Sequence, residues 1–461
     1  MPEAASYTAF VASKGSRQTV YVGANAGFLH AFDGTNGNER WAYLPRVLQP
    51  EVYRLVEPGY SHRYYVDGQI AVADAYWGGT WKTVVVAALG AGGKALVAIN
   101  VTNPNSPQVL WEFTHEDLGF VLGRPQVVRL ADGRWVVAVS NGYESARVSG
   151  ATTTTVGRMF LLDLAAGTPA AVSLGTAANL TVPAQAVKNG LGSPAIALTN
   201  GIARAAWAGD LNGNLWKFDF APTVKTNTAA NVKVAYNGSP LFTANRSNVR
   251  QPITSEPSIV PFVEGGDILV FGTGKFFETT DPANRDTQSL YGVWDRSRWS
   301  GLGRSNLAVA TLTDSGTNRF VTSAGNWWAG ADRGWRIDLT LPGERVVAAP
   351  ATVFGVSLIS TLVADSTDPC VLTQDGTLLG LNPFTAAEPA SSVFDANNDG
   401  VINDSDKVSG RVVAGVRLAD PVSVVTVTGG NVATAFTPKG STAAEIKFRN
   451  VLGRRSWRLV Q

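Results

Sequence analysis

Thr19-Val20-Tyr21-Val22-Gly23 is followed by Gly27-Phe28-Leu29-His30-Ala31-Phe32-Asp33, by a turn at Gly34–Gly37 and by Glu39-Arg40-Trp41-Ala42-Tyr43. Apolar, β-branched and aromatic residues fill the three runs, and Gly and Asn separate them. Short runs of this composition between turn residues are typical of antiparallel strands. The stretch therefore predicts three strands joined by tight turns.

The same pattern of strands and turns returns along the chain without a strict sequence repeat. One copy follows at Thr83–Ala87, Lys94–Asn100 and Gln108–Phe113. Further copies, some of them weaker, lie at Arg134–Val139 with Arg158–Asp163, Arg204–Asp210 with Gly213–Asp219, Asp267–Gly272 with Ser289–Asp295, and Pro369–Asn382. One small sheet cannot bury both of its faces, so repeated sheets stack radially and bury one another.

These copies predict an all-β fold, namely a single modified β-propeller of seven blades with inserted loops that spans residues 1–461. A stacked array of β-sandwiches is the alternative, and the regular Gly-Asp or Gly-Asn turn followed by an aromatic residue counts against it. Trp41, Trp111 and Trp216 end third strands, and we expect them to fill the space between blades rather than to form a sugar-stacking surface. Helical periodicity is nearly absent, and Ser441–Phe448 is compatible with either a helix or a strand.

Residues 395–406 match the pattern of a twelve-residue calcium loop. A hard divalent cation requires oxygen ligands, and the loop offers them at positions one, three, five, seven and twelve: the side chains of Asp395, Asn397 and Asp399, the backbone carbonyl of Val401, and the side chain of Asp406. Gly400 permits the sharp turn at position six, and we expect Ile402 to pack the loop onto its scaffold. The closing Asp406 replaces the usual glutamate, as in dockerin-type loops. An Asp/Asn-rich turn that binds nothing is the alternative.

The composition excludes several classes of protein. The formal net charge is +2, from 38 basic and 36 acidic residues, so no global field favours nucleic acid or an anionic membrane. The three histidines and the single cysteine exclude a disulfide within the chain and argue against a zinc site of Cys and His. We expect Cys370 to be a small buried apolar residue; pairing with a cysteine outside this chain is the alternative.

The ends and the apolar runs of the chain bear on its location. No apolar run approaches the roughly twenty residues that a helix needs to span a bilayer. Met1-Pro2-Glu3-Ala4-Ala5 lacks the basic and apolar regions of a signal peptide, which by itself indicates a cytoplasmic protein. A calcium loop of moderate affinity is most useful outside the cell, where calcium is abundant. We therefore expect that Met1 is not the natural start and that the natural chain extends upstream.

Other polar constellations are predicted to be structural. Asp210, Asn212 and Asn214 alternate in a Gly-Asp-Leu-Asn-Gly-Asn segment, but no carboxylate follows at the closing position, which favours a polar hairpin turn. His30 lies among apolar residues of a predicted strand, and we expect a satisfied core or turn histidine. Gly90–Lys94 lacks the Ser/Thr and the helix of a phosphate-binding loop, and we expect it in a hairpin.

Several ordered motifs resemble the C-terminal propeller domain of PilC/PilY-type proteins, which are type IV pilus tip-associated adhesins and biogenesis factors. The motifs are Val22–Asp33, Gly68–Ala75, Leu122–Pro125, Ala208–Asp219, Leu269–Phe277 and Arg454–Arg458. Because they keep their order over nearly the whole chain, the resemblance is specific. It implies a modified seven-bladed propeller that is exported and displayed at the pilus tip or cell surface, with a periplasmic pool.

The resemblance also implies a function. Family members promote pilus assembly by opposing retraction, and they support adhesion and twitching motility; pilin or minor pilins, and a host-cell or surface receptor, are the implied partners. They carry calcium sites linked to that control. One family calcium motif precedes the Ala-Gly-Asp-Leu segment, but here Ala197–Arg204 has no carboxylate, which moves the prediction to Asp395–Asp406. The family's N-terminal half, often with a von Willebrand A-like region, is not part of this chain.

The sequence therefore predicts a noncatalytic, Ca²⁺-binding pilus factor. One alternative is a quinoprotein dehydrogenase, because Leu29–Trp41 is similar to the Trp-ended repeat of such propellers, which also use calcium. The single cysteine excludes the vicinal disulfide of many of them, and no aspartate base with an arginine is evident near the loop. A calcium-dependent surface lectin is the other alternative. Whether calcium is a switch or a structural staple stays open.

Overall fold

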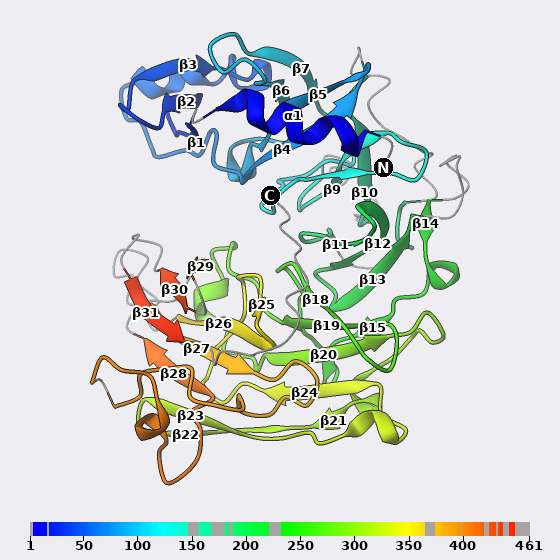
Figure 1. Ribbon diagram of the computed structural model, residues 1–461, viewed down its shortest axis with the longest axis vertical. Helices are drawn as coiled ribbons and strands as arrows, with labels where there is room; N and C mark the ends of the chain where they lie inside the picture. Colours follow the sequence, from blue (N-terminus) through cyan, green and yellow to red (C-terminus); the bar gives the residue numbers. More distant parts are fainter. Residues whose placement is uncertain are drawn as a thin grey trace. The chain divides into compact units, whose positions relative to one another are not determined.

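The computed structural model describes residues 3–15, 18–145, 156–166, 180–183, 188–220, 232–364, 374–397, 399–418, 424–429, 432–436 and 442–447. Within them short strands, almost all paired antiparallel, dominate, as the sequence predicts (Figure 1). The ambiguous stretch near residue 441 is a strand, and the helix α1 (Ala4–Lys14) was not predicted. Cys370 and Arg454–Arg458 lie outside the described residues, so the predictions about them stay untested.

The chain divides into two compact units, Met1–Leu211 with Trp216–Ser239 and Asn212–Leu215 with Pro240–Gln461. Each unit is a set of separate small sheets, as expected of blades. A single domain over residues 1–461 and a count of seven blades stay predictions.

The first unit contains α1 and four runs of consecutive strands, in which each described pairing joins neighbours along the chain. The strands are β1 (Thr19–Gly23), β2 (Leu29–Asp33) and β3 (Glu39–Tyr43); β4 (Ile70–Trp77), β5 (Thr80–Ala88), β6 (Leu96–Asn100) and β7 (Gln108–Phe113); β8 (Gln126–Arg129), β9 (Trp135–Ser140) and β10 (Met159–Asp163); and β11 (Ala195–Thr199), β12 (Ile202–Gly209), β13 (Asn214–Asp219) and β14 (Lys233–Val234). The 3-10 turns are η1 (Arg46–Leu48), η2 (Val52–Val56), η3 (Gly90–Gly92) and η6 (Tyr236–Gly238).

The second unit has larger, less regular sheets. The start of β13 pairs there with β15 (Phe242–Thr243), and β16 (Asn245–Arg246) pairs with β17 (Val249–Arg250). A sheet in the order β18-β19-β20-β24-β21 contains β18 (Ser258–Pro261), β19 (Asp267–Gly272), β20 (Ser289–Asp295), β21 (Ala308–Val309) and β24 (Gly334–Asp338). A second, in the order β22-β23-β28-β27-β26-β25, contains β22 (Thr311–Ser315), β23 (Asn318–Thr322), β25 (Ala351–Val353), β26 (Val356–Ala364), β27 (Gln374–Leu381) and β28 (Gly415–Leu418). The third is β29 (Val424–Gly429), β30 (Val432–Phe436) and β31 (Thr442–Lys447), and the 3-10 turns are η7 (Asp281–Ala283), η8 (Arg304–Asn306), η9 (Trp327–Ala329) and η10 (Asp404–Asp406).

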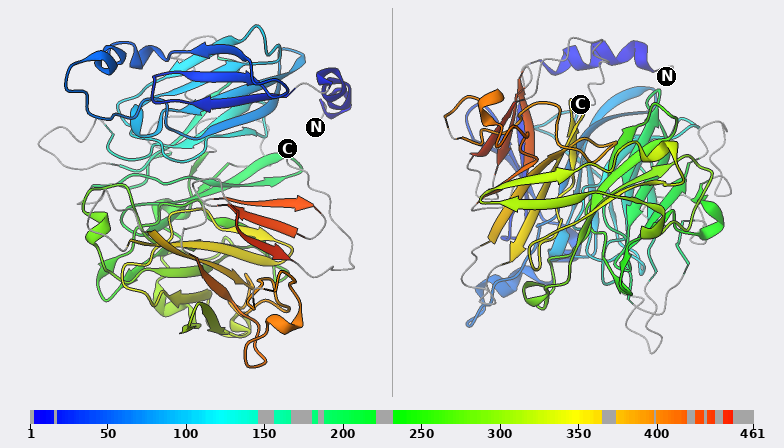
Figure 2. Two further views of the ribbon diagram at one scale, coloured as in Figure 1. Left: turned by 90° about the vertical axis from the view of Figure 1, so that its left-hand side faces the viewer. Right: turned by 90° about the horizontal axis from the view of Figure 1, so that it is seen from below.

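The first two sheets of the chain share one design. In sheet β1–β3, Ala31 pairs with Trp41 and the register then shifts by one residue; in sheet β4–β7, Ala98 pairs with Trp111 and the register shifts at the same place. Because this β-bulge lies at the same position in both sheets, β1, β2 and β3 correspond to β5, β6 and β7. Figure 2, left, shows the first sheet laid across the second. A shared apolar core that includes Leu29, from the first sheet, fills the space between them.

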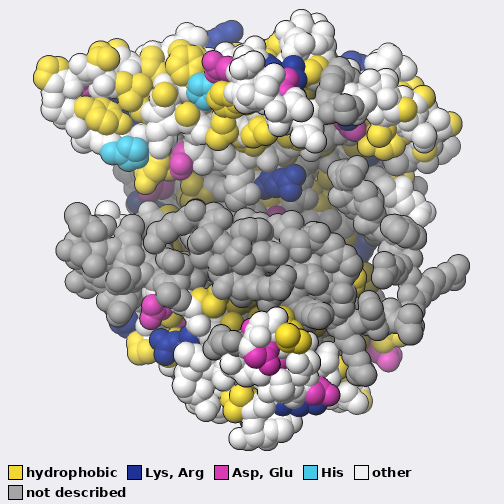
Figure 3. All heavy atoms as spheres, turned by 60° about the vertical axis from the view of Figure 1, so that its left-hand side comes forward, with side chains coloured by type: hydrophobic (Ala, Val, Ile, Leu, Met, Phe, Trp, Pro, Cys, Tyr) yellow, Lys and Arg dark blue, Asp and Glu magenta, His cyan; other side chains and the backbone are white. Residues whose placement is uncertain are grey.

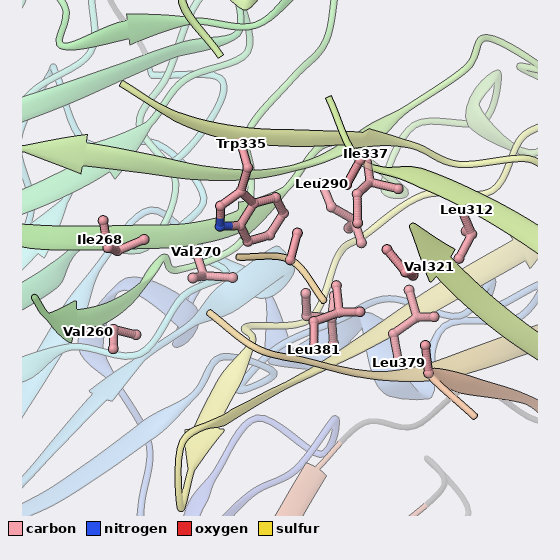
Figure 4. Packing of buried hydrophobic residues seen from close by; sticks show 14 of the residues in the cluster. Val260, Ile268, Val270, Leu290, Leu312, Val321, Trp335, Ile337, Leu379 and Leu381 are labelled. Atoms are coloured by element: carbon pink, nitrogen blue, oxygen red, sulfur yellow. The ribbon is translucent and has the colours of Figure 1, made fainter. Parts of the chain in front are cut away.

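The tryptophans that end third strands are packed, as predicted. Trp111 and Trp216 are buried and belong to the apolar cores of the first unit. Trp41 is half-buried, and its indole Nε1 donates to the backbone oxygen of Pro104. In the second unit Trp335 belongs to an apolar core with Leu290, Ile337, Val270 and neighbouring aliphatic side chains (Figure 4).

The helix α1 was not predicted from the sequence because it has no apolar stripe. None of its residues is buried, so it lacks the periodic pattern by which an amphipathic helix is recognised. It is held instead by polar contacts and rings: Tyr7 Oη and Lys14 Nζ both donate to the carboxylate of Asp74, at 3.0 and 2.6 Å. Tyr7 and Phe10 pack against the ring of Trp81. Burial, the charge of Asp74 and the hydrogen bond to it raise the pKa of Tyr7 to about 12, so the phenol keeps its proton.

Candidate metal centre

The predicted calcium loop follows two buried residues, Val393 and Phe394, that fix its start in the second unit. Both belong to an apolar core with Val413, and the ring of Phe394 approaches Gly380 on β27. Ile402, which the sequence places as the anchor, is only half-buried, and that core does not include it. The loop is therefore anchored through the residues that precede it and through the partly buried Val408 that follows it.

Hydrogen bonds to backbone amides shape the first half of the loop. Asp395 accepts from Asp399 N through Oδ1 at 3.1 Å and from Gly400 N through Oδ2 at 2.8 Å. Asn397 Oδ1 accepts from Asp399 N at 3.0 Å, and Asp399 Oδ1 accepts from Val401 N at 2.7 Å. Gly400 has φ +80°, a conformation that favours glycine. This is the tight turn that the sequence predicts at position six.

Asp406 closes the loop from a buried position. Its side chain is 1% exposed; Oδ1 accepts from Ala396 N at 2.8 Å and Oδ2 from Asn403 N at 2.7 Å. Asn403 in turn caps the 3-10 turn η10 by accepting from Ser405 N. Asp406 therefore ties the end of the loop to its beginning, which gives this carboxylate a structural role.

Asn403 and Ser405 also shape the loop, and neither contribution was predicted. Ser405 Oγ accepts from Asn397 Nδ2 at 3.0 Å, which joins loop positions three and eleven. The available signal was the alternation of Asn, Asp and Ser in Asn403–Asp406, typical of side-chain capping of a short turn. Asp404 lies elsewhere: its side chain is 83% exposed and pairs with Lys407 at 2.9 Å.

The donor set suits a hard cation in its chemistry. It consists of oxygen atoms alone, from three carboxylates, one amide and one backbone carbonyl, and both Asp395 oxygens keep a lone pair beyond the amide hydrogen bond that each accepts. Among the described residues, however, no group of three or more Asp, Glu, His or Cys side chains is gathered closely enough to hold a metal ion. Binding at Asp395, Asn397, Asp399, Val401 and Asp406 therefore stays a prediction, and it requires the side chains to draw together around the ion.

The other polar segments behave as structural turns. Asn200 and Gly201 form the two-residue connection between β11 and β12 with φ of 51° and 76°, as expected of an Asn-Gly hairpin. Asp210 is fully buried and accepts from Trp216 Nε1 at 2.8 Å and from Asn189 Nδ2 at 2.9 Å. The polar turn predicted at Asp210–Asn214 is thus confirmed. Trp216 and Asn189 supply neutral N–H donors to the Asp210 carboxylate.

The two remaining sequence predictions concern His30 and the glycine-rich segment. His30 lies on β2 with Nδ1 2.6 Å from Glu39 Oε1, which satisfies the ring. Gly90–Lys94 connects the antiparallel strands β5 and β6, and Gly90–Gly92 forms the 3-10 turn η3. Neither segment forms a catalytic or phosphate-binding arrangement.

Comparison with known proteins places the chain. The family model of the PilY1 beta-propeller domain matches residues 1–323. The chain belongs to this family. The fold is accordingly a β-propeller, and the crystal structure of the Pseudomonas aeruginosa PilY1 C-terminal domain superposes on it with a TM-score of 0.76, 31% sequence identity and coverage of 95% of both chains.

Curated relatives in the PilY1 family agree. The type IV pilus biogenesis factor PilY1 of Pseudomonas aeruginosa PAO1 is 35% identical over 449 residues, which cover 86% of this chain and 37% of that protein. A type IV pilus biogenesis factor PilY1 homolog of Xylella fastidiosa is 34% identical over 90% of this chain and 33% of its own length. The chain thus spans little more than a third of the curated relatives. These relatives are named as pilus factors, not as enzymes, and no helix among the described residues is long and apolar enough to cross a membrane.

Proposed function

We propose that this chain is the propeller region of an exported type IV pilus biogenesis factor that acts at the pilus tip and cell surface, with a periplasmic pool. The observation that carries the proposal is the match to the PilY1 C-terminal domain over 95% of both chains, together with 35% identity to a full-length PilY1. In this role the protein opposes pilus retraction and supports surface adhesion and twitching motility. Pilin or minor pilins, and a host-cell or surface receptor, are its partners.

The calcium loop is the regulatory element of this proposal. Asp395, Asp399 and Asp406 lie within one loop, and their negative charges repel one another until a cation is present. Ca²⁺ bound by these carboxylates, Asn397 Oδ1 and the Val401 carbonyl removes that repulsion, so binding and local folding are linked. At a free calcium concentration of 100 Kd this linkage contributes about 2.7 kcal/mol. That free energy is large enough to change a surface loop from mobile to fixed.

The pilus role is tested in the natural host with two strains. One strain lacks the whole gene, and the other carries a full-length copy with the single change Asp399→Ala. The deletion is expected to reduce surface pili, the twitching zone and attachment, and the same deletion in a strain unable to retract pili is expected to regain surface pili. Pili that stay absent when retraction is disabled would contradict a role in opposing retraction. Unchanged piliation, twitching and attachment in the deletion strain would overturn the proposal as a whole.

A further inference from the structure

The sheet β1–β3 lacks a counterpart of β4. Its three strands correspond to β5, β6 and β7, and β5 pairs on its other side with β4 along eight residues. Among the described residues β1 pairs only with β2. The residues of β1 are correspondingly more open: Val20 is 54% exposed, whereas its counterpart Val85 is fully buried. The edge of β1 therefore has room for one more strand.

The free edge presents a row of backbone groups. Ala24 N donates to Phe28 O and Gly34 N to Gln18 O, so in this antiparallel pair the even-numbered residues of β1 bond to β2. The alternation of an antiparallel ladder then turns the N–H and C=O groups of Thr19, Tyr21 and Gly23 outward. No backbone hydrogen bond of these outward groups is found among the described residues. Such an edge is a template for another strand.

A cavity of about 310 Å³ opens beside this edge, within the first unit. Tyr21, Val22 and Asn25 line it from β1 and its turn, and Val66, Asp67 and Ile70 line it from the segment that leads into β4. The wall is held in place because Tyr65 N donates to Asn25 Oδ1 at 3.0 Å and because Gly23 lies against the backbone of Val66, where a Cβ atom would be 2.3 Å from the Val66 carbonyl oxygen. The cavity is thus a fixed part of the edge.

Asp67 gives the cavity a charge preference. Among the described residues its carboxylate has no ion-pair partner. Burial raises the pKa of Asp67, and the hydrogen bond from the Ala91 amide and the charge of His62 lower it only in part. Asp67 itself is an exposed residue at the cavity, and a carboxylate without an ion-pair partner attracts a cation beside it. Beside the polar Asn25 and two glycines, the walls include the aromatic Tyr21 and the aliphatic Val22, Val66 and Ile70, which suit the methylene stem of a long basic side chain.

We propose that the outer edge of β1 binds one extended strand of a partner protein, which places a lysine or arginine side chain in the cavity beside Asp67. The main chain of that strand bonds to Thr19, Tyr21 and Gly23, and its alternate apolar side chains cover Val20 and Val22. Backbone pairing supplies affinity, and the basic side chain supplies specificity. Figure 3 shows that hydrophobic side chains are frequent on the surface of the first unit, and the large exposed ones include Val20 and Val22 of β1 itself.

The probe is a fluorescent peptide of about seven residues in which valine and threonine alternate around a central lysine, titrated against the intact chain and read by anisotropy. Two control peptides leave the protein unchanged: one carries N-methyl groups on the amides that would face β1, and the other has glutamine in place of lysine. The lysine peptide is expected to bind, N-methylation to weaken it at least tenfold, and glutamine to weaken it several-fold. No binding of the lysine peptide, or binding indifferent to N-methylation, overturns the proposal.

Protein variants test the cavity. Asp67→Asn keeps the size and the acceptor for Ala91 N, and it is expected to abolish the preference for lysine over glutamine while leaving the effect of N-methylation. Asp404→Asn, an exposed carboxylate of the second unit, is the matched control and is expected to change neither. A lysine preference that survives in Asp67→Asn shows that the basic side chain lies elsewhere and overturns the assignment of the cavity.

Discussion

Arg319 donates through Nη1 to Oε1 of Glu344 at 2.5 Å, and neither side chain is exposed to solvent. The guanidinium also donates to Asp314 and Thr377, and Thr361 donates to the same glutamate. A buried charge is tolerated when its partner and its remaining hydrogen bonds are all in place. This pair joins β23, β26 and β27 through polar contacts inside the second unit.

Replacing one member of the pair is expected to lower the free energy of unfolding more than replacing both. Arg319→Met leaves Glu344 charged and buried, which is expected to lower the free energy of unfolding by about 3–5 kcal/mol. The double variant Arg319→Met with Glu344→Gln restores part of that loss, because no fully buried charge is left uncompensated; Asp314, which also loses its partner, is 31% exposed. Urea unfolding followed by circular dichroism measures both, with Arg417→Met, on an exposed pair, as the control. A double variant less stable than Arg319→Met would contradict the argument.

A second prediction concerns the stability of the fold at low pH. Burial would raise the pKa of Asp338, but hydrogen bonds from Ser289 and Arg304 and the charge of Arg304 outweigh it and hold that pKa below its ordinary value. A carboxyl group with a depressed folded-state pKa stabilises the fold above its unfolded pKa of about 3.9 and loses that contribution as pH falls through the folded value.

The test is the urea midpoint between about pH 6 and pH 2 for the parent and for Asp338→Asn. The parent is expected to lose stability steeply below about pH 4, whereas the variant starts less stable and declines less over the same range. Asp332→Asn serves as the control. Asp332 is close to Asp338 in sequence, and among the described hydrogen bonds its side chain makes none to Arg304. Equal slopes for the parent and Asp338→Asn would show that Asp338 does not carry this part of the acid sensitivity.

A third prediction concerns α1, which makes two of its polar contacts with one carboxylate, that of Asp74. Asp74 accepts hydrogen bonds from Tyr7, Lys14 and Thr83. Since the helix buries no residue of its own, Asp74→Ala is expected to detach it while the sheets stay folded. Hydrogen exchange of the peptide that covers residues 3–15 should then accelerate at least tenfold, with unchanged exchange in β5 and β6. Asp132→Ala, whose carboxylate pairs with Arg134, is the control. Unchanged protection of α1 in Asp74→Ala would show that the aromatic contacts of Trp81 suffice.

Local pattern predicted the strands and turns well, because the signals for them lie within a few residues. The three strands between Thr19 and Tyr43 and the packed Trp111 are examples in which composition and spacing determine the outcome. Arg319 and Glu344 illustrate the opposite case: they are 25 residues apart, and nothing near either residue reveals the partner. The helix α1 was missed for a related reason, since its attachment depends on Asp74, 60 residues beyond Lys14.

In the candidate metal loop, too, some features follow from the local sequence and others depend on distant residues. The turn at Gly400 and the Asx hydrogen bonds of Asp395 and Asp399 follow from residue type and spacing, and the structure has them. The burial of Asp406 and the anchoring by Phe394 in place of Ile402 depend on the core beneath the loop, which no local pattern encodes. The metal itself is a matter of ligand geometry, so it is settled by a binding measurement.

The last prediction separates ligand from structural carboxylates in that loop. Calorimetric titration of chelator-stripped protein with Ca²⁺ is expected to show one site in the parent. Asp399→Ala is expected to abolish it without unfolding the protein, because among the described residues the Asp399 carboxylate is bonded only within the loop, by Val401 N and Asn397 Nδ2. Asp404→Ala removes the same charge from an exposed position beside Lys407 and is expected to leave the site intact.

Asp406→Ala is expected to abolish binding and also to loosen the loop without calcium, because this carboxylate holds Ala396 N and Asn403 N. Hydrogen exchange at residues 395–406 without calcium distinguishes the two variants: Asp399→Ala is expected to lose protection only near Val401 N, whereas Asp406→Ala is expected to lose it at both ends of the loop, at Ala396 N and Asn403 N. Equal calcium affinity in the parent, Asp399→Ala and Asp406→Ala would remove the loop as the site. Equal loss in Asp404→Ala and Asp399→Ala would instead mean that total charge, and not the ligand positions, determines the affinity.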